Sequence, residues 1–87
     1  MSYEYEEMNE LNELNAKAIK QALARNVLSQ KWLRHRLDRD WGIKVSYVVL
    51  SDVLEGKRPL GRKMKRMLWC SEQIIREYEE FYRRKEG

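Results

Sequence analysis

Residues 46–61 read SYVVLSDVLEGKRPLG, and the fold depends on how this stretch is interpreted. Its β-branched residues suit a strand of a hairpin as well as a helix. The opening serine is a good helix N-cap, however, and three aliphatic residues have the i, i+3, i+4 spacing of one helix face. These residues are Leu50, Val53 and Leu54. Because Gly56 can adopt the positive φ at which helices commonly end, we predict a helix over residues 47–55.

Two helices are predicted before this stretch. Apolar residues recur at intervals of three and four from about residue 8 to residue 24, which is the spacing of one helix face. Residues 25–28 interrupt this pattern. Ser29 can then cap a second helix, which we expect over residues 30–39, and Gly42 can close it with a positive φ.

A long helix is predicted after this stretch. Pro59 is the only proline, and from Gly61 to about Arg84 nothing interrupts the helical spacing of apolar residues. Such a helix would be roughly 36 Å long at 1.5 Å per residue, which exceeds the small body that it covers. We therefore expect an all-α fold of four to five helices, in a single domain of residues 1–87 with an acidic N-terminal arm over residues 1–8.

The composition is typical of one small soluble protein. A chain of 87 residues is too short for two hydrophobic cores. No segment approaches the ~20 consecutive apolar residues of a membrane-spanning helix, so we expect no membrane partner. The N-terminus is acidic where a signal peptide would be basic, and a single cysteine excludes an internal disulfide, so a cytoplasmic location is expected.

Charge is distributed unevenly along the chain. The net charge is +4, from 18 Lys and Arg against 14 Asp and Glu, but residues 1–13 contain five glutamates and no cation. The densest basic stretch spans residues 57–66, with six cations and no acid. A basic block can simply be a solvated helix face, or it can face a polyanion. Its position directly after the predicted 47–55 helix favours the second interpretation.

Two motifs carry a resemblance to a known family. The first is Leu28-Ser29-Gln30-x-x-Leu33, and the second is Val45-Ser46-x-x-x-Leu50-Ser51-x-Val53-x-x-Gly56-Lys57-Arg58. Together they resemble the helix-turn-helix of the phage repressor/Cro (XRE-like) family, over about residues 19–68. In that family a Ser/Thr-Gln pair opens the first helix of the motif, and a second Ser/Thr caps the recognition helix. The resemblance implies a λ-repressor-like fold with a long C-terminal helix, in a small phage-encoded regulator.

The sequence departs from the family pattern at two places. Arg34 follows Leu33, where the family usually has a small alanine. The stretch from Leu37 to Ser46 is also five or six residues longer than the tight turn of the family. These extra residues imply either a longer second helix or a wider loop that holds Trp41.

The predicted 47–55 helix is the expected DNA-reading element, because the major groove admits one α-helix. The residues expected to face the bases are Tyr47, Val48, Ser51 and Asp52. This face lacks the Arg, Asn and Gln side chains that make the best bidentate base contacts, so modest specificity is expected. Phosphate contacts are expected from Gln30, Lys44, Ser46, Lys57, Arg58, Arg62 and Lys63.

The distal part of the last helix, residues 72–87, is the expected dimer interface. Its apolar stripe would be exposed beyond a compact body, which is rare in soluble monomers. The stripe contains Ile74, Ile75, Tyr78, Phe81 and Tyr82. A C2 homodimer would place two reading helices one DNA turn apart. The alternative is that this stripe packs against the first helix, near Leu11.

Other conspicuous residues have simpler explanations than catalysis. Trp32, Trp41 and Trp69 lie beside leucines at helical spacing, so they are expected in the core or an interface rather than as base-stacking platforms. His35 has no second metal ligand at a useful spacing, and Cys70 has no nearby histidine to activate it. With no phosphate-binding loop motif either, we expect no enzymatic activity, no metal and no cofactor.

The sequence therefore favours a regulator of phage or mobile-element type, acting as a repressor that binds double-stranded operator DNA as a dimer. The alternative is a protein-interaction module, an antirepressor or adaptor that keeps the fold but binds another phage or host regulator or a replication protein. Two acids on the predicted reading helix, Asp52 and Glu55, and the acidic residues 1–13 support this alternative.

Overall fold

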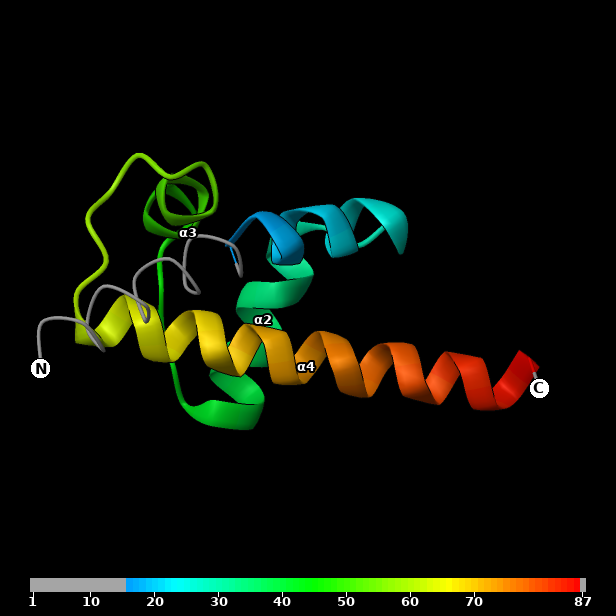
Figure 1. Cartoon of the computed structure of the whole chain (residues 1–87). Coiled ribbons are helices and arrows are strands. Elements are labelled where there is room, and N and C mark those ends of the chain that lie inside the picture. Colours follow the sequence, from blue (N-terminus) through cyan, green and yellow to red (C-terminus); the bar gives the residue numbers. More distant parts are fainter. Residues whose placement is uncertain (1–15, 87) are drawn as a thin grey trace, which may run out of the picture.

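The computed structural model describes residues 16–86, with side chains as far as Tyr82. Within this range the chain forms four helical segments and no strand, which confirms the all-α prediction and excludes a hairpin there. The helices are an N-terminal helix at residues 16–25, α2 (Gln30–Trp41), α3 (Tyr47–Leu54) and α4 (Arg62–Glu86) (Figure 1). The acidic arm over residues 1–8, Leu11 and the predicted start of the first helix lie outside the described residues.

The capping residues of α2 act as the sequence predicts. Ser29 has an extended backbone, and its Oγ accepts a hydrogen bond of 3.0 Å from the Trp32 N–H. Gly42, with φ of 65°, ends the helix in the left-handed region and donates its N–H to the Asp38 carbonyl at 3.0 Å. α2 ends at Trp41, two residues later than predicted, so the extra length is divided between a longer helix, which includes Trp41, and the connection over residues 42–46.

The same local chemistry defines α3. Ser46 Oγ accepts a hydrogen bond of 3.2 Å from the Val49 N–H at the start of the helix. After Leu54 the chain turns at Gly56, whose φ is 74°. The Lys57 N–H then donates to the Asp52 carbonyl at 2.8 Å, which brings the basic loop back against the end of the helix. These contacts fix both ends of the expected reading helix.

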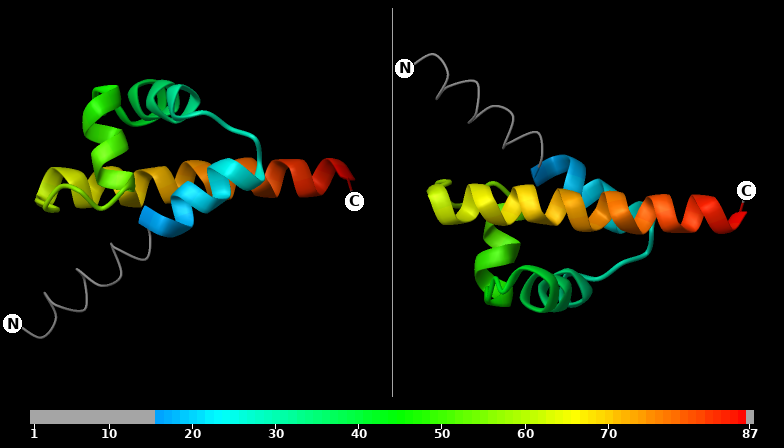
Figure 2. Two further views of the ribbon diagram at one scale, coloured as in Figure 1. Left: turned by 90° about the horizontal axis from the view of Figure 1, so that it is seen from above. Right: turned by 90° about the horizontal axis from the view of Figure 1, so that it is seen from below.

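α2 packs against both α3 and the long α4. Figure 1 shows the N-terminal helix and α3 on one side of α4, while α2 crosses behind it. Figure 2 shows that the last turns of α4 extend beyond the other described helices. The largest fully buried apolar side chains are Leu33 and Leu37 of α2, Leu50 and Val53 of α3, and Met67, Leu68 and Ile74 of α4. No helix among residues 16–86 has both the length and the hydropathy that a membrane crossing requires.

Two of the expected dimer residues belong instead to this core. Ile74 and Ile75 are only 1% and 4% exposed, so the prediction that they form the interface is wrong. The N-terminal helix lies against this part of α4: Ala18, Ile19 and Ala22 line a small hollow together with Ile75, and Arg25 forms an ion pair of 2.9 Å with Glu79. The alternative expectation placed the stripe against the first helix near Leu11, which lies outside the described residues. Within them, Ile75 lies beside the N-terminal helix. The spacing of apolar residues identified a buried face but did not identify what covers it.

Candidate nucleic-acid interface

α3 has a buried face and an exposed face, as predicted. Leu50, Val53 and Leu54 are buried against the core. On the opposite side, Tyr47 and Val48 are 56% and 63% exposed. The other two expected reading residues are Ser51 and Asp52, which are half-buried. The most accessible part of α3 is therefore its first turn, which has one aromatic and one aliphatic side chain.

Both acidic side chains of this region are paired with cations of the same chain. Arg58 Nη2 lies 3.5 Å from Asp52 Oδ2. Lys20 Nζ of the N-terminal helix lies 2.5 Å from Glu55 Oε1, and this hydrogen bond with the lysine, assisted by its charge, lowers the pKa of Glu55. The negative charge that would repel a polyanion beside α3 is therefore largely balanced within the chain. The sequence did not predict these pairings. Lys20 and Glu55 are 35 residues apart, so their contact depends on how the helices pack.

Two exposed lysines flank α3. Lys44 lies in the connection before the helix, and Lys57 lies in the loop after it. Neither forms an ion pair with a carboxylate among residues 16–82, although the charge of Lys57 contributes, after Lys20, to lowering the pKa of Glu55. A basic side chain at each end of an exposed helix is suited to the phosphates on the two sides of a groove. Lys63 is also exposed, at the start of α4.

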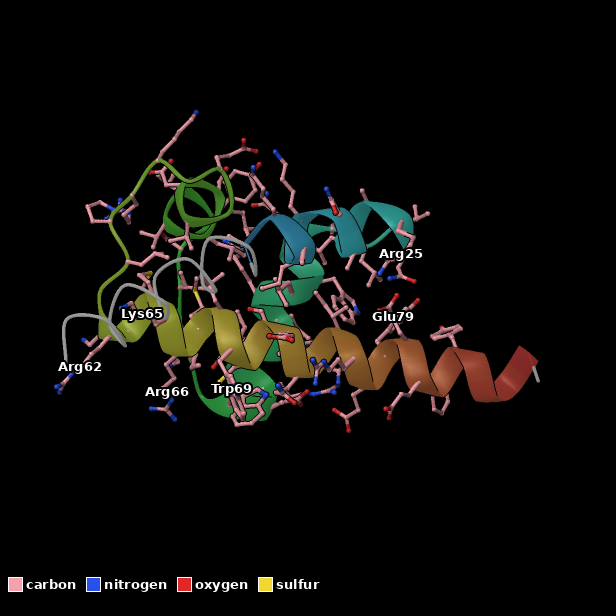
Figure 3. The ribbon with its side chains drawn as sticks, in the orientation of Figure 1. Arg25, Arg62, Lys65, Arg66, Trp69 and Glu79 are labelled. Atoms are coloured by element: carbon pink, nitrogen blue, oxygen red, sulfur yellow. The ribbon has the colours of Figure 1, made fainter. Side chains whose placement is uncertain are left out.

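The basic stretch at residues 57–66 does not form one continuous strip. In Figure 3, Arg62 and Arg66 point to the side of α4 that faces away from α3. Arg62 was expected to contact phosphates beside α3, and the structure does not bring it there. Arg62 and Arg66 point the same way because side chains four residues apart lie on the same face of a helix. Only the first part of the stretch, with Lys57 and Arg58, lies at the end of α3.

Ser46 and Gln30, at the N-termini of α3 and α2, differ in the hydrogen-bond donors that they could offer to a phosphate. Ser46 uses a lone pair to cap α3, and a hydroxyl that accepts one bond still has a hydrogen to donate. Gln30 is half-buried, and its Oε1 is buried without a hydrogen-bond partner in the part of the chain that is described. A phosphate contact from Gln30 would therefore depend on Nε2, the donor atom of the same amide.

Arg34 is a site residue that sequence reasoning did not identify. Its guanidinium carbon lies 6.0 Å from the centre of the Tyr47 ring, within the range of a cation–π contact. Its Nε is buried without a hydrogen-bond partner in the described part of the structure. Arg34 thus connects α2 to the first residue of α3 and restricts where the Tyr47 ring can lie. The signal available in the sequence was Arg34 itself, which stands where the resemblance described above implies a small alanine.

An open groove of about 920 Å³ adjoins the end of α3. Its walls are residues 16–20 of the N-terminal helix, the last turn of α3 and the loop that follows. The cations on its lining are Lys17, Lys20, Lys57 and Arg58. Lys17 and Lys20 are 37 residues or more before the loop in sequence, so composition alone did not connect them to the basic stretch. They extend the positive region beside α3 onto a second helix.

The remaining candidate residues are placed as follows. Trp32 is partly buried, with its ring edge-to-face with Tyr78 at 5.3 Å between centroids. Cys70 is buried, and this burial raises the pKa of its thiol, against a smaller opposing effect of Arg66. His35 is exposed. Residues 16–82 contain no cluster of three or more side chains that could hold a metal ion.

Comparisons with protein-family models, with curated proteins and with solved structures found no match to this chain.

Proposed function

We propose that the protein is a transcriptional regulator of phage or mobile-element type, which binds operator DNA by inserting α3 into the major groove. The observation that carries this proposal is the exposed first turn of α3 between two exposed lysines. Tyr47 and Val48 are accessible there, and Lys44 and Lys57 lie before and after the helix. A helix with an exposed side and flanking cations fits a groove about 12 Å wide with phosphates on both edges.

The base contacts in this proposal are few. The Tyr47 hydroxyl can donate or accept a hydrogen bond, and Val48 can contact a thymine methyl group. Ser51 can bond to several base edges from the next turn. Asp52 can accept a hydrogen bond from a cytosine amino group only where its carboxylate is not occupied by Arg58, 3.5 Å away. Discrimination between sequences should therefore depend mainly on Tyr47, Val48 and Ser51.

Most of the affinity in this proposal comes from phosphates. Lys44, Lys57 and the groove residue Lys17 are exposed cations, and the Ser46 hydroxyl can donate to a phosphate oxygen. Each neutralised phosphate releases counterions, so binding weakens as salt rises. For a dimer that makes several phosphate contacts, we expect log K to fall with log salt concentration at a slope of about −4 to −8.

The proposed regulator acts as a C2 homodimer through the distal end of α4. With Ile74 and Ile75 in the core, the interface is reduced to Tyr78, Phe81 and Tyr82. Phe81 and Tyr82 are exposed, and the ring centroids of Tyr78 and Tyr82 lie 4.4 Å apart. Phe81 and Tyr82 lie near the C-terminal end of α4, whereas the ring of Tyr78 also packs edge-to-face against Trp32 of α2, with 5.3 Å between centroids. An aromatic cluster at the end of the molecule leaves α3 accessible for DNA.

The proposal is tested with the double variant Lys44→Glu/Lys57→Glu, measured by fluorescence anisotropy with the promoter DNA beside the gene. Binding should fall by at least tenfold, and the salt dependence should become shallower. The matched control is Arg62→Glu/Arg66→Glu, which has the same charge change on the other side of α4. Arg58 is left unchanged, because a glutamate there would face Asp52 and disturb the end of α3. Equal loss in both variants, or no binding by the wild type at low salt, would reject the proposal.

The alternative function, a protein-interaction module, has less support from α3 than the sequence suggested. That function was supported by Asp52 and Glu55 as negative charges that a partner protein could bind. In the structure, both carboxylates are instead paired with cations of the same chain. If α3 bound a protein instead of DNA, Lys44→Glu/Lys57→Glu would leave that protein complex nearly unchanged. The same variant therefore distinguishes the two functions.

A further inference from the structure

A second surface with the composition of a binding site lies where the end of α2 meets α4. Trp41 and Trp69 are 38% and 52% exposed, and their rings pack edge-to-face with centroids 5.7 Å apart. Trp41 is the last residue of α2, and Trp69 lies on α4. Two tryptophans that pack together at the surface form an exposed apolar patch. Tryptophan and arginine are also the residues most enriched at the energetic centres of protein interfaces.

Arginines continue this patch along α4. Arg62, Arg66 and Trp69 follow one another at intervals of four and three residues, so they share a helix face. In Figure 3, Arg66 and Trp69 both point to the side of α4 that faces away from α3. Arg62 and Arg66 are exposed, and neither has a carboxylate partner within residues 16–82. We call Trp41, Trp69, Arg62 and Arg66 the Trp–Arg face.

The acids near this face do not balance its charge. Asp40 is paired with Arg39 and Arg36 at 2.9 and 2.7 Å, and the hydrogen bonds from Arg39 and then Arg36 lower the pKa of its carboxyl. Glu72 is paired with Arg76 at 2.9 Å. Asp38, on the last turns of α2, is exposed and contributes one negative charge. Arg62 and Arg66 therefore leave the face with a positive charge beside its aromatic patch.

We propose that the Trp–Arg face binds an acidic segment of a partner protein. A large apolar side chain of that segment would lie against Trp41 and Trp69, and its carboxylates would pair with Arg62 and Arg66. Because this face and α3 lie on opposite sides of α4, one molecule can hold the partner and DNA together. The inference does not depend on α3 binding DNA.

Two other occupants fit the face less well. The planes of the two tryptophan rings are 83° apart, so parallel stacked bases of a nucleic acid cannot lie on both rings. In a two-fold dimer formed through this face, each copy of the chain would present the Trp–Arg face to the same face of the other copy. That contact would bring the arginines of the two copies together, and their repulsion would oppose association. An acidic segment matches both the charge and the apolar patch.

The test uses the full chain and a short synthetic peptide of glutamate and leucine with one central phenylalanine. The peptide carries a fluorescent label, so its binding is followed by fluorescence anisotropy, a signal that does not depend on the tryptophans of the protein. Saturable binding is expected, and it should weaken at least about tenfold in Arg62→Glu/Arg66→Glu and in Trp69→Ala. The matched control, Lys44→Glu/Lys57→Glu, should bind the peptide within about twofold of the wild type. Circular dichroism verifies the fold of each variant, and the arginine pair stays informative if Trp69→Ala does not fold.

Four results would overturn this inference. The first is no saturable binding of the peptide by the wild type, and the second is an equal loss in Lys44→Glu/Lys57→Glu, which would indicate general charge attraction. The third is loss of DNA binding in Arg62→Glu/Arg66→Glu, which would assign the face to nucleic acid. The fourth is a wild-type dimer that Trp69→Ala converts to a monomer in sedimentation, which would assign it to a second copy. If DNA binding fails altogether, the peptide titration still tests the face by itself.

Discussion

Arg58 lies 3.5 Å from Asp52, so a cation of the expected phosphate-binding loop is held by an acid of the expected reading helix. Both side chains are partly exposed, so solvent screens this ion pair and it contributes little to folding stability. Its importance is for the DNA proposal, because the pair places a negative charge near the phosphates and engages one of the positive charges. The pair should therefore limit the affinity of α3 for a polyanion.

Asp52→Asn should raise the affinity for DNA by about threefold to tenfold at low salt, because the change removes one negative charge and releases Arg58. Fluorescence anisotropy over a range of salt concentrations measures the effect, which should diminish as salt rises. Asp38→Asn has the same charge change at the end of α2 and should alter affinity by less than twofold. A weaker complex with Asp52→Asn would mean that its carboxylate makes a direct base contact.

Val27→Gly should stabilise the protein. Val27 is 91% exposed and has φ of 56°, and a β-branched side chain in this left-handed region is strained by roughly 1 kcal/mol or more. Glycine removes the strain at some cost in unfolded-chain entropy, so we expect a gain of about 0.5–1 kcal/mol and a Tm higher by about 3–6 °C. Ala24→Gly, one turn earlier in the N-terminal helix, should lower stability by about 1 kcal/mol. If both changes destabilise the protein, the Val27 conformation is not strained.

Ile74→Ala and Phe81→Ala should separate the core from the proposed dimer interface. Ile74 is buried, so its truncation should lower the free energy of unfolding by about 2–5 kcal/mol. Phe81 is exposed, and its truncation should cost less than about 1 kcal/mol in a monomer while weakening dimers in sedimentation equilibrium. A dimer that resists Phe81→Ala and Tyr82→Ala together would remove the distal helix from the interface.

Cys70 should react slowly with iodoacetamide at pH 8, because burial keeps the pKa of its thiol above the ordinary value and only the thiolate reacts. The protonated thiol of Cys70 contributes fully to folding stability at pH values below the ordinary thiol pKa. As pH rises past about 9, the unfolded chain ionises first, so stability falls through this range. Thermal unfolding of the wild type and Cys70→Ala from pH 7 to pH 10 measures this loss, which the variant should lack. Rapid labelling of the folded protein would contradict the prediction.

The starts and ends of α2 and α3 were predictable from the sequence to within two residues. Ser29 and Ser46 cap α2 and α3, and Gly42 and Gly56 adopt the positive φ expected of them. These signals are readable because each acts within about one turn of its own position. The inner face of α3 was predictable for a similar reason, since a periodicity of 3.6 residues places its aliphatic side chains together.

The composition of each surface was decided by the tertiary structure. Ile74 and Ile75 belong to the core because other helices cover them, with the N-terminal helix beside Ile75, and apolar spacing cannot say which element covers a face. Lys20 pairs with Glu55, which is 35 residues away in the sequence. Arg62 points away from α3, although it belongs to the same basic stretch as Lys57. The sequence by itself determined the helices and the apolar faces, because caps and periodicity are local. Which charges meet, and which side of α4 each cation occupies, depends on how the helices pack, and this involves contacts between residues far apart in the chain.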